Sequence, residues 1–485
     1  MSKLIFEKSS PGRRAVNLPH LTEAEKKCRL HIPPKYYREQ PAELPELSEL
    51  EVCRHFVNLS RKNFSVDGNM YPLGSCTMKY NPKVCERIAS LDGFASLHPL
   101  LPQLRGGGML TQGALEVLFE TEHMLCEVVG MDAFSLQPSA GAHGELTGMM
   151  LIAAYHRNKG NKKTRVIIPD SAHGTNPSTA AIAGYSVTTV PTGPDGDMDL
   201  AKFEASLGDD VAAVMLTCPN TLGLFERDIA KIAGMAHRYD ALLYYDGANL
   251  NAIMGRCRPG DLGFDVVHVN LHKTFATPHG GGGPGSGPVG VKARLIPFLP
   301  TSVVVKRTDG TFALEYDRPQ SIGYIAPFYG NFAIILRAYA YMLLLGGNGM
   351  RRVSENAVLS ANYIMAKLKD RYDLPYNRTC MHECVFSATR QTAKGVHALD
   401  VAKALIDRGL HPPTIYFPLV VKEALMIEPT ETESREQMDE FIQAMLEISD
   451  LADSDPKAFA SMPRTTGVCR VDETKAVRDM KFKAD

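Results

Sequence analysis

The stretch that decides the fold is residues 242–273, which read LLYYDGANLNAIMGRCRPGDLGFDVVHVNLHK. Two short apolar runs, Leu242–Tyr245 and Val266–Leu271, flank a polar, glycine-containing connection. Asp246 follows the first run directly, and Lys273 lies 27 residues later, just after the second. This spacing leaves room for one crossover and one strand. Because ligands bind at the carboxyl ends of strands in open parallel sheets, we expect Asp246 and Lys273 to face one pocket.

The same rhythm extends toward the N-terminus. Apolar runs that are typical of strands occur at Arg165–Ile168, Ser186–Val190 and Ala212–Thr217. Helical patterns lie before and between them, at Gln112–Val129, Glu145–Arg157 and Asp228–Tyr239. Strands that alternate with helices predict βαβ units and a mostly parallel sheet covered on both faces. The predicted fold class is therefore α/β.

Changes in composition divide the chain into three parts. Residues 1–65 form a proline-rich arm with a helical patch around Ser48–Leu59. We expect a large domain over 66–335 and a smaller α+β domain over 336–485. The patterns that indicate the smaller domain are helices at Asn348–Lys369, Val396–Arg408 and Ser434–Leu451, and strands at Met381–Thr389 and Thr414–Phe417.

Composition and charge exclude several classes of protein. Apolar residues make up 44% and charged residues 22% of the 485, and the net charge is −1. These values are ordinary for a globular protein and give no field that attracts nucleic acid or an anionic membrane. The uncharged stretch 319–336 is broken by proline and glycine, so we expect no membrane segment. Ten scattered cysteines and a start without an apolar leader predict reduced thiols and a cytoplasmic location.

Lys273 is the sharpest candidate for chemistry. The glycine-rich loop Phe275–Pro288 follows it, and glycine permits close approach of the backbone to a ligand. A buried lysine has a lowered pKa and can form a Schiff base. If pyridoxal phosphate is the partner, a carboxylate must keep its pyridine nitrogen protonated, and Asp246 is suitably placed. A solvated surface lysine and a helix-capping aspartate are the simpler alternatives.

Two further motifs favour a pyridoxal pocket. Ser139–Ala142 is a small-residue turn that opens a helix, where free N–H groups and the helix dipole can bind a phosphate. An ordinary capped turn explains the same residues. His173 follows the strand at Arg165–Ile168 and could act as a base, bind a metal or be a core residue; in a pyridoxal pocket it could stack on the cofactor ring.

Two motifs that suggest other ligands are discounted. Gly285–Gly290 fits the dinucleotide pattern G-x-G-x-x-G, but a glycine and proline loop precedes it rather than a strand. Cys380–Cys384 contains metal-ligand residue types without a second cluster nearby. We therefore expect neither a nicotinamide cofactor nor a metal.

The residues also resemble a known family. The stretch 244–291 is similar to the cofactor-lysine region of glycine dehydrogenase (decarboxylating), the P-protein of the glycine cleavage system. Its run HKTF…PHGGGGPG is long and specific. Further matches are Tyr71–Lys79, Leu136–Glu145 and Asp170–Pro177, with a looser one at Thr465–Glu473. The resemblance covers about residues 10 to 475 and is to the cofactor-holding half of the two-subunit form.

The resemblance implies an aminotransferase-like fold, that of fold type I pyridoxal phosphate enzymes. The cofactor would be bound as an aldimine on Lys273. Asp246 would meet the ring nitrogen and His173 would stack on the ring. The phosphate would be held by the turn, with help from His272; the turn consists of Ser139, Ala140, Gly141 and Ala142. The family often has Asn-Ser at the first two of these positions, which puts a role for the Ser139 hydroxyl in doubt.

The implied activity is decarboxylation of glycine with transfer of the aminomethyl group to the lipoyl arm of H-protein and release of CO2. The implied assembly is a heterotetramer with two copies of subunit 1. Two alternatives stay open: a decarboxylase or desulfurase of the same fold for another amino acid, and a non-catalytic scaffold subunit. Lys273 and Asp246 argue against the scaffold.

Residues for the glycine carboxylate are not identified by the sequence. Arg337, Arg105 and Arg318 are candidates because arginine binds carboxylates with two hydrogen bonds. Two interpretations of Tyr71–Lys79 remain open. It lines the path of glycine or of the lipoyl arm, or it is an ordered loop that supports the dimer.

Overall fold

The computed structural model describes residues 3–17, 19–20, 22–24, 33–36, 38, 40, 42–104 and 107–480. The chain divides into two compact units, 1–68 and 69–485, each considered by itself. In the first, the elements are η1 (Phe6–Lys8), η2 (Pro34–Tyr36) and α2 (Glu49–Ser60). Ser48 and Glu51 form a capping box at the start of α2, which confirms the predicted helical patch.

The second unit is built on a seven-stranded, mostly parallel sheet with the order β1-β7-β6-β5-β4-β2-β3. Its strands are β1 (Ala133–Ser135), β2 (Arg165–Pro169), β3 (Ser186–Val190), β4 (Val211–Thr217), β5 (Leu242–Gly247), β6 (Val266–Val269) and β7 (Val289–Val291). β7 runs antiparallel to the strands on either side of it, β1 and β6, and the other strand pairs of this sheet are parallel. The central strands β4 and β5 are buried along their whole length, as expected for a parallel sheet covered on both faces. The predicted sheet is confirmed.

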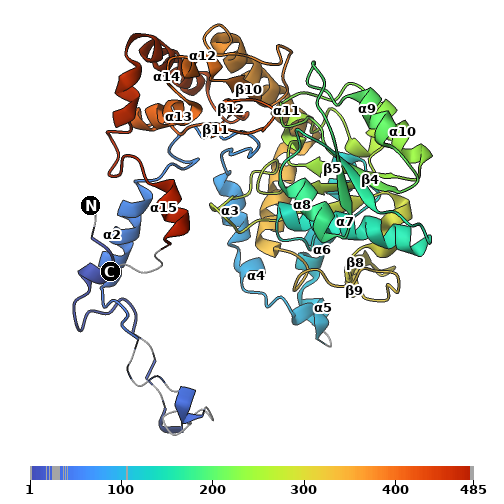
Figure 1. Ribbon diagram of the computed structural model, residues 1–485. Coiled ribbons are helices and arrows are strands. Elements are labelled where there is room, and N and C mark those ends of the chain that lie inside the picture. Colours follow the sequence, from blue (N-terminus) through green and yellow to red (C-terminus); the bar gives the residue numbers. More distant parts are fainter. Residues whose placement is uncertain are drawn as a thin grey trace. The chain divides into compact units, whose positions relative to one another are not determined.

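Helices cover both faces of this sheet, as Figure 1 shows. Alternate residues of one strand face different cores: Ile167 belongs to the core of one face, while Val166 and Ile168 belong to the other. The helices α7 (Gly141–Asn158) and α8 (Thr175–Ile182) pack on one face. The opposite core includes side chains from α6 (Gln112–Val129), α9 (Leu200–Ser206), α10 (Ile229–Arg238) and α11 (Phe332–Leu368).

A smaller region of the same unit has its own sheet and core. Its antiparallel strands have the order β10-β12-β11, with β10 (Cys384–Ser387), β11 (Thr414–Ile415) and β12 (Ala424–Ile427). Three helices accompany them: α12 (Thr389–Thr392), α13 (Ala398–Asp407) and α14 (Arg435–Ser454). The expected strands Met381–Thr389 and Thr414–Phe417 are found in shorter form. The four-residue strand β12 was not predicted.

The long helix α11 links the two cores. Its N-terminal part, with Ile335, packs in the large core, and its C-terminal part, with Ile364, packs in the small core. Gly346, with φ of 58°, divides it into two helical stretches. The sequence predicted only the second stretch, and the predicted domain boundary at 335/336 falls in the first turn. Among the described helices, α11 alone is long and apolar enough to cross a membrane by length and composition. Its buried side chains lie in protein cores.

Short elements complete the second unit, including the hairpin of β8 (Val303–Lys306) and β9 (Phe312–Glu315). The others are α3 (Lys83–Ala89), α4 (Asp92–Ala95), η3 (Leu101–Gln103), α5 (Gly107–Leu110), η4 (Leu250–Ala252), η5 (Pro259–Leu262), η6 (Ala293–Phe298), η7 (Pro456–Ser461) and α15 (Glu473–Arg478). One irregular segment matters for the site. Leu73 forms a bridge with Ile427 of β12, so the chain around 71–79 lies along the small sheet.

Candidate active site

A cavity of about 170 Å³ lies at the carboxyl ends of β4, β5 and β6. Most of the site residues predicted from the sequence line it, namely Gly141, Ala142, His173, Asp246, His272 and Lys273. Ser139 and Ala140 are not among the lining residues but form the turn that leads into Gly141. The topology explains the convergence, because neighbouring parallel strands end at the same edge of the sheet.

The turn before α7 has the features of an anion site. Ala140 is the extended N-cap residue, and no side chain among the described residues caps the first N–H groups of this 18-residue helix. A Cβ atom on Gly141 would lie 2.6 Å from Asn270 Oδ1, so glycine is needed for the close approach. The Ser139 hydroxyl lies 3.3 Å from His143 Nδ1 and so is engaged away from the cavity. The backbone of this turn is thus better placed than the Ser139 hydroxyl to hold a phosphate.

The glycine-rich loop supports this turn from behind. Gly287 N donates to the Pro138 carbonyl at 2.9 Å, and a Cβ atom on Gly287 would lie 2.1 Å from the Ala140 carbonyl oxygen. Within the discounted dinucleotide motif, Gly290 serves β-strand packing, because a Cβ there would meet the Phe134 ring at 2.3 Å. Close packing therefore explains why Gly287 and Gly290 are glycines, without a bound dinucleotide.

Gly287→Ala is expected to weaken cofactor binding by about tenfold or more, because the added methyl group must displace the backbone of the phosphate turn. Gly234→Ala in α10, where a Cβ meets nothing within 4 Å, is the matched control and should bind as the parent does. Titration of both variants with pyridoxal phosphate measures the dissociation constants. Equal affinities would show that the turn does not hold the phosphate.

Asp246 lies at the floor of the cavity and is only 3% exposed. Its carboxylate accepts hydrogen bonds from Asn176 Nδ2 and the Ala248 N–H, each at 3.0 Å, and His268 Nε2 lies 3.3 Å away. Burial alone would raise the pKa of Asp246, but His268, these hydrogen bonds and Lys273 together hold it below its usual value. An ionised carboxylate at this place fits a group that presents a protonated ring nitrogen.

Glu145 is a cavity-lining residue whose function the sequence did not suggest. It accepts a hydrogen bond from the Thr175 hydroxyl at 3.0 Å, and that hydroxyl lies 2.8 Å from His173 Nδ1. Its other oxygen accepts from the same Asn176 amide that contacts Asp246. Burial and the charge of Asp246 raise the pKa of Glu145 to about 7. Glu145 thus connects His173, the candidate for stacking on the ring, with Asp246, the candidate for contact with the ring nitrogen.

A sequence signal for Glu145 existed. It lies four residues after Gly141, so both occupy the same face of the first turns of α7. His173 itself is exposed at the cavity, and its pKa is lowered by partial burial and by the charge of Lys273. A neutral imidazole in that position is suited to stacking on a flat ring.

Lys273 projects into the cavity from the loop that follows β6. It is half-buried rather than fully buried, and its Nζ donates a hydrogen bond to the Ser75 carbonyl at 2.7 Å. Ser75 itself lines the cavity. Two buried polar atoms of the lining, Thr217 Oγ1 and Asn270 Oδ1, have no hydrogen-bond partner among the described residues. Together with the cationic, anionic and N–H groups, they fit a polar aromatic cofactor that carries a phosphate.

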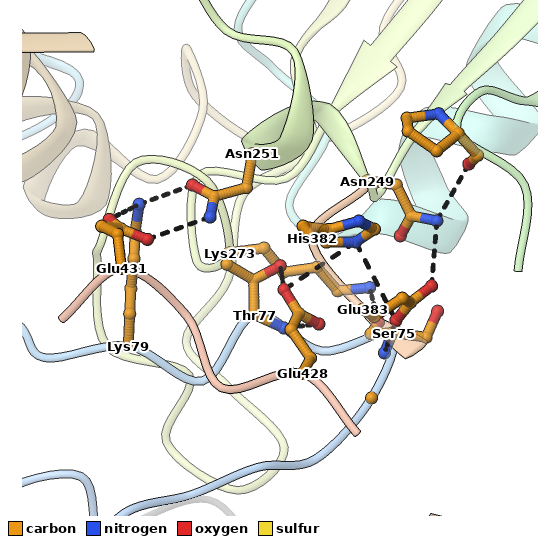
Figure 2. A network of polar contacts seen from close by, with 12 residues as sticks. Ser75, Thr77, Lys79, Asn249, Asn251, Lys273, His382, Glu383, Glu428 and Glu431 are labelled. Carbon is orange, nitrogen blue, oxygen red and sulfur yellow. Dashed lines mark hydrogen bonds and ion pairs between the residues drawn. The ribbon is translucent and has the colours of Figure 1, made fainter. Parts of the chain in front are cut away.

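Lys79 does not line the cavity, which speaks against the interpretation that this residue of the Tyr71–Lys79 segment lies on the path of glycine or the lipoyl arm. It is 2% exposed and donates to Glu431 Oε1 and Asn251 Oδ1, each at 2.8 Å, as Figure 2 shows. Tyr341 OH is a third partner at 3.1 Å. Lys79 therefore supports the loop, whereas Ser75 of the same segment reaches the cavity.

Lys79→Ala is expected to destabilise the chain by about 3–5 kcal/mol, because it leaves Glu431 buried without its cation. Covalent binding of pyridoxal phosphate to the folded fraction should persist. Denaturant unfolding followed by cofactor titration at low temperature separates the two effects. A Lys79→Ala variant that is as stable as the parent but fails to turn over glycine would show that Lys79 lies on the substrate path.

The proposed arginines are engaged elsewhere. Arg337 makes two hydrogen bonds to Glu86, each at 2.8 Å, and Arg318 donates to the Ile296 carbonyl. Arg105 lies outside the described residues. Within the described part of the chain, no arginine lines the cavity. The expectation that Arg337 or Arg318 meets the glycine carboxylate finds no support in this arrangement.

Comparison with known proteins agrees with this geometry. A family model for the glycine cleavage system P-protein matches residues 20–315, and one for the C-terminal domain of glycine dehydrogenase matches residues 353–461. The chain belongs to the P-protein family. A relative from Listeria monocytogenes serotype 4b, named probable glycine dehydrogenase (decarboxylating) subunit 2, is 55% identical over 98% of this chain and 96% of its own. A relative of the same name from Pelodictyon phaeoclathratiforme is 56% identical over 99% and 98%.

Solved structures show the fold. The crystal structure of a glycine decarboxylase (P-protein) in inhibitor-bound form matches with a TM-score of 0.74 at 22% identity, covering 89% of this chain and all of that one. A glutamate decarboxylase from Lactobacillus brevis matches with a TM-score of 0.64 at 13% identity, covering 89% and 97%. The predicted fold type I architecture of pyridoxal phosphate enzymes is thereby confirmed.

Proposed function

We propose that this P-protein chain decarboxylates glycine with pyridoxal phosphate bound covalently to Lys273. The observation that carries the proposal is the convergence of Lys273, Asp246, His173 and the N-terminus of α7 on one cavity. Membership of the family and the names of relatives that align over nearly their whole length support the same activity.

When bound, pyridoxal phosphate supplies an electron sink for the pair of electrons that glycine releases as its carboxylate leaves as CO2. Lys273 Nζ would hold the cofactor, and the Ser75 carbonyl accepts from that Nζ. Asp246, whose pKa is held below its usual value, would face the ring nitrogen as an ionised carboxylate. His173 would stack on the ring, and Glu145 orients His173 through Thr175. The first N–H groups of α7 would hold the phosphate, with His272 beside them.

The remaining predictions about partners follow from the family. We propose that the aminomethyl group passes to the lipoyl disulfide of H-protein. We also propose that subunit 1 completes a heterotetramer with two copies of each subunit; the name subunit 2 on the relatives supports such a partner. A cytoplasmic location is proposed from the cysteines, because the nine that lie in the described residues are all free thiols.

The proposal is tested by glycine-dependent exchange of labelled CO2 in the chain mixed with subunit 1 and lipoylated H-protein. We expect exchange that needs glycine, pyridoxal phosphate and H-protein together. Exchange with another amino acid in place of glycine would leave the fold assignment unchanged and show that the substrate is that other amino acid. No exchange with any amino acid, in a mixture whose subunit 1 is folded, would favour the scaffold alternative.

A further inference from the structure

Two glutamates are buried behind Lys273 in the small sheet. Glu383 directly precedes β10 and Glu428 directly follows β12, and both are 0% exposed. The two strands are antiparallel with Cys384 opposite Ile427, so the next positions of the register place the two glutamates opposite each other. Like charges directly opposite one another destabilise a sheet, and burial increases that cost.

Each glutamate binds one end of the same short turn. Glu383 Oε2 accepts from the Ser75 N–H at 2.7 Å. Glu428 accepts from the Thr77 N–H at 2.9 Å and from the Thr77 hydroxyl at 2.6 Å. The Ser75 carbonyl in turn accepts from Lys273 Nζ, so a continuous set of contacts runs from the glutamates to the cofactor lysine. Figure 2 shows these side chains in one network.

The turn needs such support because its backbone is strained. Ser75 has φ of 63° and Thr77 has φ of 45°, both in the left-handed region that residues other than glycine seldom adopt. Such conformations persist only where surrounding contacts enforce them. The hydrogen bonds from the two glutamates supply that enforcement at both residues.

The chemistry of the pocket favours a protonated acid in this pair. Burial and the facing Glu428 carboxylate raise the pKa of Glu383 well above its usual value, and burial raises the pKa of Glu428 to about 7. His382 does not neutralise them, because burial and then the charge of Lys273 lower its pKa to about 3. Its Nε2 lies 3.9 Å from an oxygen of each glutamate. Neither ring nitrogen has a hydrogen-bond partner in the described part of the chain.

Other titratable groups surround the pair. Lys273 is the facing cation and favours ionisation of both glutamates, whereas Glu431 opposes it for Glu428. The thiols near the pair belong to Cys76, Cys380 and Cys384. One cation facing two buried carboxylates leaves one of them without a counter-charge.

We propose that Glu383 and Glu428 are positioning residues that share one proton at neutral pH and hold the Ser75–Thr77 turn so that the Ser75 carbonyl fixes Lys273 Nζ. The inference rests on the proposed function only in taking Lys273 as the cofactor lysine. An amine fixed by this carbonyl samples fewer orientations, so it reacts faster with an aldehyde placed in the cavity.

The shared proton has a measurable consequence for stability. The pKa of each glutamate is higher in the folded chain than in the unfolded chain, so the folded chain binds more protons. The stabilisation is complete below pH about 4.5 and is lost as pH rises through 7 and above. Glu145 adds to the same trend, so the test compares variants rather than the parent alone.

The first test measures the melting temperature of the full-length apo chain from pH 5 to pH 8. Glu383→Gln and Glu428→Gln should each reduce the decline in melting temperature by at least about 2 °C relative to the parent, because each removes half of the facing pair. Glu440→Gln, at an exposed position of α14, is the control and should leave the decline unchanged. Slopes that match the parent in both variants would overturn the shared proton.

The second test measures the rate at which Lys273 captures pyridoxal phosphate, by borohydride reduction and mass spectrometry of the Lys273 peptide. Glutamine reproduces a protonated carboxyl group and can still accept the Ser75 or Thr77 N–H. We expect a loss of less than about threefold for each glutamine variant and of about tenfold or more for Glu383→Ala and Glu428→Ala. Equal losses for glutamine and alanine would contradict the proposal.

Two more outcomes keep the test decisive. If the alanine variants do not fold, the pH dependence of the melting temperature of the glutamine variants still shows whether the two glutamates share a proton. A stoichiometric divalent metal at His382, Glu383 and Glu428 in the purified chain would overturn the proposal, because metal-bound carboxylates are ionised. Neither test uses glycine, so a failure of the proposed substrate leaves these results unaffected.

Discussion

Lys273→Ala is expected to abolish covalent binding of pyridoxal phosphate and to lower glycine turnover by about 10⁴-fold or more, because no other amine lines the cavity among the described residues. Borohydride reduction followed by mass spectrometry of the intact chain measures the attachment. Labelled CO2 exchange measures the turnover. The fold should survive, since a half-buried side chain with one hydrogen bond is removed.

The control for this variant is Lys162→Ala, because Lys162 is exposed in the loop between α7 and β2. It should keep both attachment and turnover at the parental level. A Lys273→Ala chain that still carries reducible cofactor at parental stoichiometry would show that another lysine is the attachment site. The assignment of the whole cavity would then fail.

Asp246→Asn is expected to retain the cofactor but to lower turnover by about 10²–10³-fold. The substituted amide carries no charge, so it cannot keep a pyridine nitrogen protonated, and the electron sink is weakened. The hydrogen bond from Asn176 is also lost or weakened. Exchange kinetics at saturating glycine, with cofactor content measured in the same sample, test this result.

Asp265→Asn is the matched control for Asp246→Asn. Asp265 is a buried aspartate of the same unit that accepts from the Leu243 N–H at 2.9 Å and lies 2.9 Å from His237 Nε2. It does not line the cavity. Its replacement should lower stability and leave turnover per folded chain unchanged. Equal turnover losses in the two variants would mean that the Asp246 effect is structural.

The large sheet was predictable because its strands differ sharply from their surroundings. Apolar runs such as Leu242–Tyr245 are buried on both faces, so no polar alternation obscures them. Each of these strands leads into a polar group at one edge, which is why Asp246 and Lys273 could be brought together from spacing alone. The short strand β12 gave no comparable signal, since four residues fit many structures.

The rest of the site depends on contacts between distant parts of the chain. The contact of Ser75 with Lys273 joins residues 198 positions apart, and that of Thr77 with Glu428 joins residues 351 apart. The sequence singled out the Tyr71–Lys79 segment, including Ser75 and Lys79, but could not show which of these two residues reaches the cavity. Only the small sheet, which pairs Leu73 with Ile427, shows that Ser75 reaches the cavity while Lys79 is buried in an ion pair.

The absorption spectrum of the purified chain with pyridoxal phosphate, recorded before and after glycine, measures whether Lys273 binds the cofactor and whether glycine reacts there. We predict a visible band of covalently bound cofactor that shifts when glycine is added and that borohydride fixes on Lys273. Subunit 1 is added in a second run, so that a cavity completed by the partner is also measured. A band that ignores glycine but responds to another amino acid, or no band in either run, would contradict the account.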